Sequence, residues 1–215
     1  MDGDNSIHLL GLVREPFQSI NSSMSVCARH LHPNHINNFI CIIHNMTRVC
    51  RSSLIHLKHK YEDTQGTSDH HPSKLMHHGT SVRGDIMQDR QNASMVAEMC
   101  GSLLLQCSEL LHTYPPFGMI ELLEAIGSAV RGLHQSWEIL DDLKSELSER
   151  NAGGESKIAE KEPPKLLPSI AVLWPNLITV LKLPSQKTSV LVASLDTAVQ
   201  VVNCGGGFFF SRGLK

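Results

Sequence analysis

Two consecutive apolar stripes over residues 166–202 limit what this chain can fold into. In both, apolar residues recur every three or four positions, which is the period of one face of an α-helix. The short connection around Pro184 predicts antiparallel neighbours, and Gly205 is expected to end the second helix in the left-handed conformation. We predict core positions on these stripes at Leu166, Ile170, Trp174, Leu177, Leu181, Leu195, Val199 and Val202.

Two longer stripes of the same kind, over residues 96–111 and 123–147, come before this pair. The run Tyr114-Pro115-Pro116 separates them, because proline and the residue before it disfavour a continuing helix. This spacing predicts four helical segments, joined as two antiparallel hairpins. Stacked hairpins of this length are how helical repeats bury a continuous core. The pattern therefore predicts an all-α fold of ARM/HEAT-like hairpins from an α-solenoid.

The first part of the chain has a different composition. Residues 1–95 hold eleven of the thirteen histidines, and Gly, Ser, Asp and His dominate residues 65–90. Such a composition predicts poor order, apart from one amphipathic segment with apolar residues at helical spacing from Ile36 to Leu57. The predicted organisation is an irregular segment 1–35, an isolated amphipathic helix 36–60, a disordered His-rich linker 61–91, helical hairpins 92–207 with a loop at 151–164, and a tail 208–215.

Charge and hydropathy argue against several classes of function. The formal net charge is −2, which gives no reason to expect general binding to nucleic acid or to an anionic membrane. No stretch approaches the roughly 20 apolar residues that span a bilayer. The N-terminal residues lack the pattern of a signal peptide, so we expect the six cysteines to be reduced thiols.

Candidate chemical sites are few. The chain has no Gly-x-Ser-x-Gly nucleophile motif, and we expect no catalytic residues and no cofactor. Cys27-x2-His30 and Cys41-x2-His44 offer four side chains of the kinds that bind zinc. One alternative is therefore a small zinc-binding module in residues 27–78, fused to a helical adaptor. Chance spacing in a histidine-rich segment is the favoured interpretation, because the usual Cys-x2-Cys pair is absent.

The C-terminal residues resemble a known family. The run Leu166-Leu167-Pro168 followed by Trp174-Pro175-Asn176-Leu177 is similar to the Leu-Leu-Pro … Trp-Pro-x-Leu helix of the Tel-two-interacting protein one family, particularly its plant members. The run Cys204-Gly205-Gly206-Gly207-Phe208-Phe209 resembles the family's Cys-Gly-Gly-Asp-Phe-Phe segment, with Gly207 in place of the acidic residue. The resemblance covers about residues 94–211 and leaves out residues 1–90.

The resemblance implies a non-enzymatic HEAT-repeat scaffold of the Triple T co-chaperone complex, located in the cytoplasm and also in the nucleus. The implied partners are Tel-two-like and Tti-two-like subunits, the ninety-kilodalton heat-shock chaperone system and the phosphatidylinositol-three-kinase-related kinases that the complex helps to mature. We expect the chain to be a truncated form or a fragment of such a solenoid. The other alternative is a truncated product without independent activity. The resemblance does not indicate which residues bind which partner.

Overall fold

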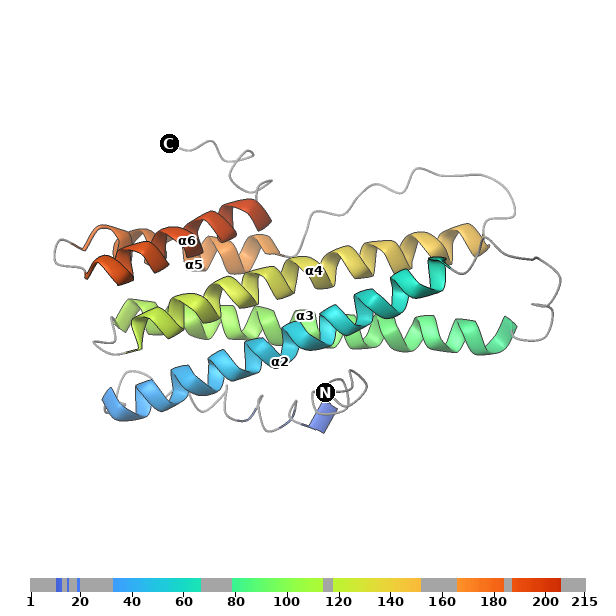
Figure 1. The fold of residues 1–215 in the computed structure, drawn as a ribbon, viewed down its shortest axis with the longest axis horizontal. Coiled ribbons are helices and arrows are strands. Elements are labelled where there is room, and N and C mark those ends of the chain that lie inside the picture. The colour runs from blue at the N-terminus through green and yellow to red at the C-terminus, as the bar shows by residue number, and fades with distance from the viewer. Residues whose placement is uncertain are drawn as a thin grey trace.

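The computed structural model describes residues 11, 12, 15, 19, 33–66, 79–113, 118–151, 166–183 and 187–205. These form the helices α2 (Pro33–Gly66), α3 (Gly79–Thr113), α4 (Met119–Asn151), α5 (Leu166–Leu181) and α6 (Thr188–Cys204), shown in Figure 1. No strand occurs in these ranges, and the helices pack against one another. The predicted all-α class is confirmed, and the layered packing is consistent with a helical-repeat-like fold.

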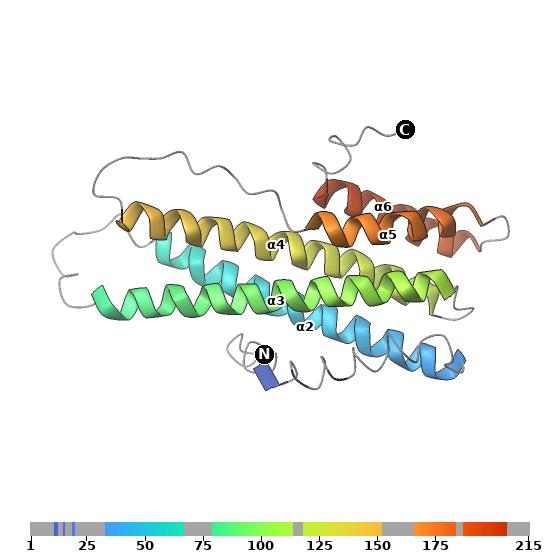
Figure 2. The same cartoon turned by 180° about the vertical axis from the view of Figure 1, so that it is seen from behind.

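The helices are arranged in layers around the antiparallel α3–α4 hairpin. In Figures 1 and 2, α2 lies along one side of this hairpin and the α5–α6 hairpin lies on the other. Helix α5 packs mainly on α3, and α6 packs mainly on α4. Because α5 and α6 are only 16 and 17 residues long, they cover the C-terminal part of α3 and the N-terminal part of α4. The two hairpins therefore form successive layers of one stack.

One hydrophobic core runs through all of the layers. It includes residues from every helix, and burial of this apolar surface is the main driving force for such packing. Helix α4 occupies the centre, because it contacts α2, α3, α5 and α6. The largest fully buried side chains are Ile40, Ile43, Leu54, Leu103, Leu104, Leu110, Leu111, Leu122, Leu123, Ile126 and Leu143.

The histidine-rich half differs from the predicted organisation. Helix α2 is not isolated, since its apolar face packs against both α4 and α3. Helix α3 begins at Gly79 and includes the predicted boundary near Gln91; Asn92 and Ala93 just after it are buried. The predicted linker 61–91 is thus helical at 61–66 and 79–91, while residues 67–78 fall outside the described residues. Residues 33–35 of the predicted irregular segment belong to α2. The helical conformation of α2 and α3 extends from their packed turns into the adjacent polar residues, because adding a residue to an existing helix is far easier than starting one.

The connection between α3 and α4 depends on a glycine. Helix α3 ends at Thr113, directly before Tyr114-Pro115-Pro116. Gly118 then has a φ of +77°, and its carbonyl accepts a 2.9 Å hydrogen bond from the backbone N–H of Leu122 in the first turn of α4. A Cβ atom at Gly118 would lie 2.7 Å from Oδ1 of Asn37 on α2. Both the backbone conformation and the close approach of α2 therefore require glycine here.

Helix α6 ends differently from the prediction. Gly205 has a φ of −104°, so it does not adopt the left-handed conformation. Its N–H instead donates a 2.9 Å hydrogen bond to the carbonyl of Val201. This bond satisfies one of the last carbonyls of the helix without a left-handed residue.

Candidate interaction surface

Helix α6 places its more polar face inward and its most apolar face outward. Ser194, Thr197 and Val201 are the buried residues of this helix. Five large apolar side chains on the opposite face are 39–59% exposed, and we call them the outer stripe: Leu191, Val192, Leu195, Val199 and Val202. Leu195, Val199 and Val202 were predicted to be core residues, and the structure corrects that prediction.

Close packing of α6 on α4 explains which face is buried. The hydroxyl oxygen of Thr197 lies 3.1 Å from the carbonyl of Leu123 on α4 and 2.8 Å from the carbonyl of Ala193 within α6. A Cβ atom at Gly127 of α4 would collide with the side chain of Gln200 of α6. Small and hydroxyl-bearing residues suit such a close approach, whereas leucine side chains would hold the helices further apart. The helix therefore turns both of its leucines and three of its valines, Val192, Val199 and Val202, outward.

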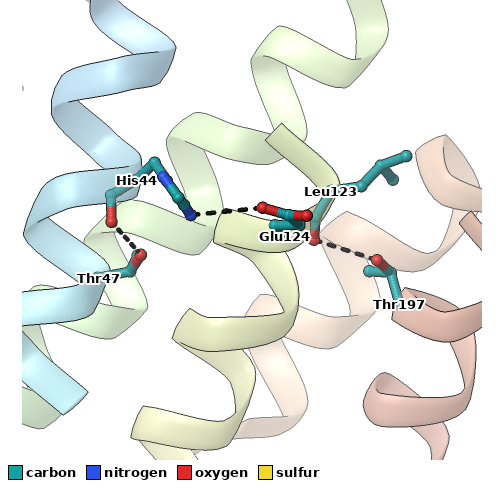
Figure 3. A network of polar contacts seen from close by, with 5 residues as sticks. All are labelled: His44, Thr47, Leu123, Glu124 and Thr197. Carbon is teal, nitrogen blue, oxygen red and sulfur yellow. Dashed lines mark hydrogen bonds and ion pairs between the residues drawn. The ribbon is translucent and has the colours of Figure 1, made fainter. Parts of the chain in front are cut away.

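Polar contacts connect α4 to the layers on both of its sides (Figure 3). Toward α2, Oε2 of Glu124 lies 3.6 Å from Nε2 of His44, an ion pair when the histidine is protonated. Toward α6, the carbonyl of the preceding residue, Leu123, accepts the Thr197 hydrogen bond. One turn of α4 thus contacts a helix from the histidine-rich half and the last helix of the stack.

Two of the four candidate zinc ligands, Cys41 and His44, lie in the described part of the chain. Cys41 is exposed on α2, and His44 is directed toward Glu124 (Figure 3). Cys27 and His30 lie outside the described residues. Within the described ranges, no three His, Cys, Asp or Glu side chains are grouped so that they could hold a metal ion.

The α5 stripe packs inward as a stripe of this kind should. Ile170 and Leu177 are fully buried, while Trp174 and Leu181 are partly buried. The side chain of Leu166 is outside the described set. Helix α5 continues through Pro175, although proline cannot donate the usual backbone hydrogen bond.

A polar junction joins α5 to α3 beside this proline. Nδ2 of Asn176 donates to the carbonyl of Ser108 at 3.0 Å and to its hydroxyl at 2.9 Å. The hydroxyl of Ser108 donates in turn to the carbonyl of Val172 at 3.2 Å. Ser108 is only 1% exposed, so these groups would be costly to bury without partners. The junction therefore favours one register between the two helices.

We predict that Asn176→Ala lowers the free energy of unfolding by about 1–3 kcal/mol, because it leaves the buried Ser108 groups without their donor. Urea unfolding followed by circular dichroism measures the change. Asn203→Ala is the matched control: Asn203 is exposed on α6, and its replacement should change stability by less than about 0.5 kcal/mol. Equal effects of the two substitutions would show that the junction does not stabilise the fold.

The buried cysteines have the properties of core residues. Burial raises the pKa of the Cys107 thiol to about 12. A hydrogen bond with Cys50, together with burial, raises the pKa of Cys100 well above its usual range. A thiol is nucleophilic as the thiolate, so neither Cys100 nor Cys107 is suited to nucleophilic chemistry near neutral pH.

Comparison with known proteins adds no family or function. No protein-family model, no curated protein and no solved structure matches this chain. In the parts of the chain that the structure describes, none of the helices combines the length and the apolar character needed to cross a membrane. The outer stripe is the most distinctive surface feature of the described residues. The sequence pattern does not reveal it, because it assigns three of its members, Leu195, Val199 and Val202, to the core.

Proposed function

We propose that this chain is a non-enzymatic scaffold for protein interactions. The observation that supports this best is the layering, in which the α5–α6 hairpin packs on the α3–α4 hairpin through one continuous core. Stacked helices of this kind build extended surfaces for binding and need no reactive groups. Helices α2, α3 and α4 have 34, 35 and 33 residues. At 1.5 Å per residue each is about 50 Å long, so their outward faces form a long surface.

The more specific proposal is based on the resemblance to the Tel-two-interacting protein one family. The first of the two motifs that carry it lies on α5, and the second begins at Cys204, the last residue of α6. We therefore propose a HEAT-like scaffold that supports the maturation of phosphatidylinositol-three-kinase-related kinases. Its proposed partners are Tel-two-like and Tti-two-like subunits, together with the ninety-kilodalton heat-shock chaperone system, in the cytoplasm or the nucleus.

A binding experiment with purified components tests this proposal. The full chain is immobilised and offered a Tel-two-like protein and a Tti-two-like protein, separately and together. We expect the folded chain to retain at least one of them and the urea-unfolded chain to retain neither. If the folded chain, verified by circular dichroism, retains neither protein, the proposed role is wrong, although the all-α fold is unaffected.

A further inference from the structure

Two cysteines from distant parts of the chain meet where α2, α3 and α4 pack together. Cys50 lies on α2 and Cys100 lies on α3, and both side chains are buried as free thiols. The two thiols are hydrogen-bonded to each other. A Cβ atom at Gly132 of α4 would lie close both to Sγ of Cys100 and to Cδ1 of Leu54, which is one turn after Cys50 on α2. The sulfur of Cys100 therefore faces the part of α2 that carries Cys50.

The fold singles out this pair among the cysteines that the structure describes. Cys107 is two turns after Cys100 on α3 and is equally buried, but burial alone raises the pKa of its thiol and no second thiol contributes. Cys41 is exposed, and Cys204 is half-buried at the end of α6, near Arg131 and Glu138. A hydrogen bond between two thiols already holds their sulfur atoms close, so only a small shift of α2 toward α3 separates the pair from the short S–S distance of a disulfide.

Thiol–disulfide exchange with a small-molecule disulfide such as oxidised glutathione would form this bond. The thiolate of one cysteine attacks a sulfur of oxidised glutathione, breaks its S–S bond and releases one glutathione. The thiolate of the other cysteine then attacks the protein sulfur of this mixed disulfide and releases the second glutathione. The two protein thiols lose two electrons and two protons, and both are recovered in the two molecules of reduced glutathione.

The packing controls when this exchange takes place. While α2 lies against α3, the hydrogen bond with Cys50 and burial raise the pKa of Cys100, and no water-borne oxidant reaches either sulfur. Local opening of α2 exposes both thiols to water, where the thiolate is less costly to form. Reclosing then returns the two sulfurs to each other, so the second step is favoured over pairing with any other cysteine.

We propose that Cys50 and Cys100 are a redox-sensitive clamp, which ties α2 to the α3–α4 hairpin when a small-molecule disulfide oxidises the pair. This inference goes beyond the scaffold role and does not depend on any of the partners proposed above. The bond would join residues 50 positions apart. Because a cross-link of this length restricts the unfolded chain, oxidation should raise the urea midpoint of unfolding by about 1 M.

Peptide mapping of the full chain tests the proposal. The reduced protein is incubated for hours with oxidised glutathione, the remaining thiols are alkylated, and the digested peptides are identified by mass spectrometry. We expect the Cys50–Cys100 cross-link to be the main disulfide of the folded chain and a minor one after oxidation in concentrated urea. The urea midpoint should rise in parallel, and dithiothreitol should return it to that of the reduced protein.

Cys107→Ala is the matched control, because it removes an equally buried thiol from the same helix. This variant should keep the cross-link and the rise in midpoint, whereas Cys50→Ala and Cys100→Ala should each lose both. The map of the wild type remains decisive if either of these two variants folds poorly. The proposal is overturned if the folded chain yields only mixed disulfides with glutathione, if it yields the same pairs as the unfolded chain, or if the cross-link leaves the midpoint unchanged.

Discussion

Replacement of Ile126 by alanine is expected to destabilise the protein by about 2–5 kcal/mol, the usual cost of a large cavity in a well-packed core. Ile126 is completely buried and lies on α4, the helix that contacts α2, α3, α5 and α6. A cavity at this position removes contacts in the most constrained part of the fold, where neighbouring helices cannot easily close the gap. The free energy of unfolding, obtained from urea titration at low protein concentration, measures the effect.

Leu195→Ala is the informative comparison. Ile126 and Leu195 both lie on apolar stripes of helical period, so the sequence pattern alone predicts that both are buried. Leu195 is 52% exposed, and alanine is at least as good a helix former, so its replacement should cost less than about 1 kcal/mol. Similar losses for Ile126→Ala and Leu195→Ala would contradict the observed orientation of α6.

Gly132→Ala is expected to destabilise the protein by about 1–3 kcal/mol, as overpacking of a core does. Alanine favours a helix over glycine by about 1 kcal/mol, so local propensity alone predicts the opposite sign. A Cβ atom at Gly132 would lie 2.9 Å from Sγ of Cys100 on α3 and 3.7 Å from Cδ1 of Leu54 on α2. Both neighbours are 1% exposed, so they have little room to move.

A second substitution isolates the cause. In a Cys100→Ala background the sulfur atom is gone, and Gly132→Ala should then stabilise the protein by up to about 1 kcal/mol through helix propensity. Comparison of the four proteins by urea unfolding forms a double-mutant cycle, in which the reversal of sign measures the coupling between α3 and α4. A stabilising effect of Gly132→Ala in both backgrounds would show that the two helices are further apart than the structure places them.

The sequence predicts where the helices lie along the chain better than it predicts which of their faces pack against other helices. Stripes at 96–111, 123–147, 166–181 and 191–202 correspond to α3, α4, α5 and α6, because each helix buries or gathers its apolar residues on one face. The period does not reveal which face of a helix meets the rest of the chain. In α6 the buried face contains Ser194 and Thr197, and the hydrogen bond from Thr197 to Leu123 joins residues 74 positions apart. No local pattern in the sequence contains that information.

Composition was a weaker guide than periodicity. The change in histidine content suggested a boundary near Gln91, yet α3 passes through that position without a break. The apolar period from Ile36 to Leu57 predicted a helix, but its packing on α3 and α4 depends on the tertiary fold. The polar junction between Ser108 and Asn176 is equally non-local, since two ordinary polar residues become partners only when α5 packs on α3. The zinc hypothesis stays a prediction, because Cys27 and His30, with which the spacing groups Cys41 and His44, lie outside the described residues.

The central claim is that α2 to α6 share one core, and the two tryptophans test it most directly. Trp137 lies on α4 in the central layer and Trp174 lies on α5 in the outer layer, both partly buried against the core. Trp174→Phe leaves the central tryptophan as the only indole reporter, and Trp137→Phe leaves the outer one. In each variant, tryptophan fluorescence and far-ultraviolet circular dichroism are followed through the same urea titration. A single cooperative core predicts that the two transitions coincide in both variants. If the Trp174 signal changes at a lower urea concentration than the circular dichroism does, the α5–α6 hairpin unfolds separately and the claim of one continuous core is wrong.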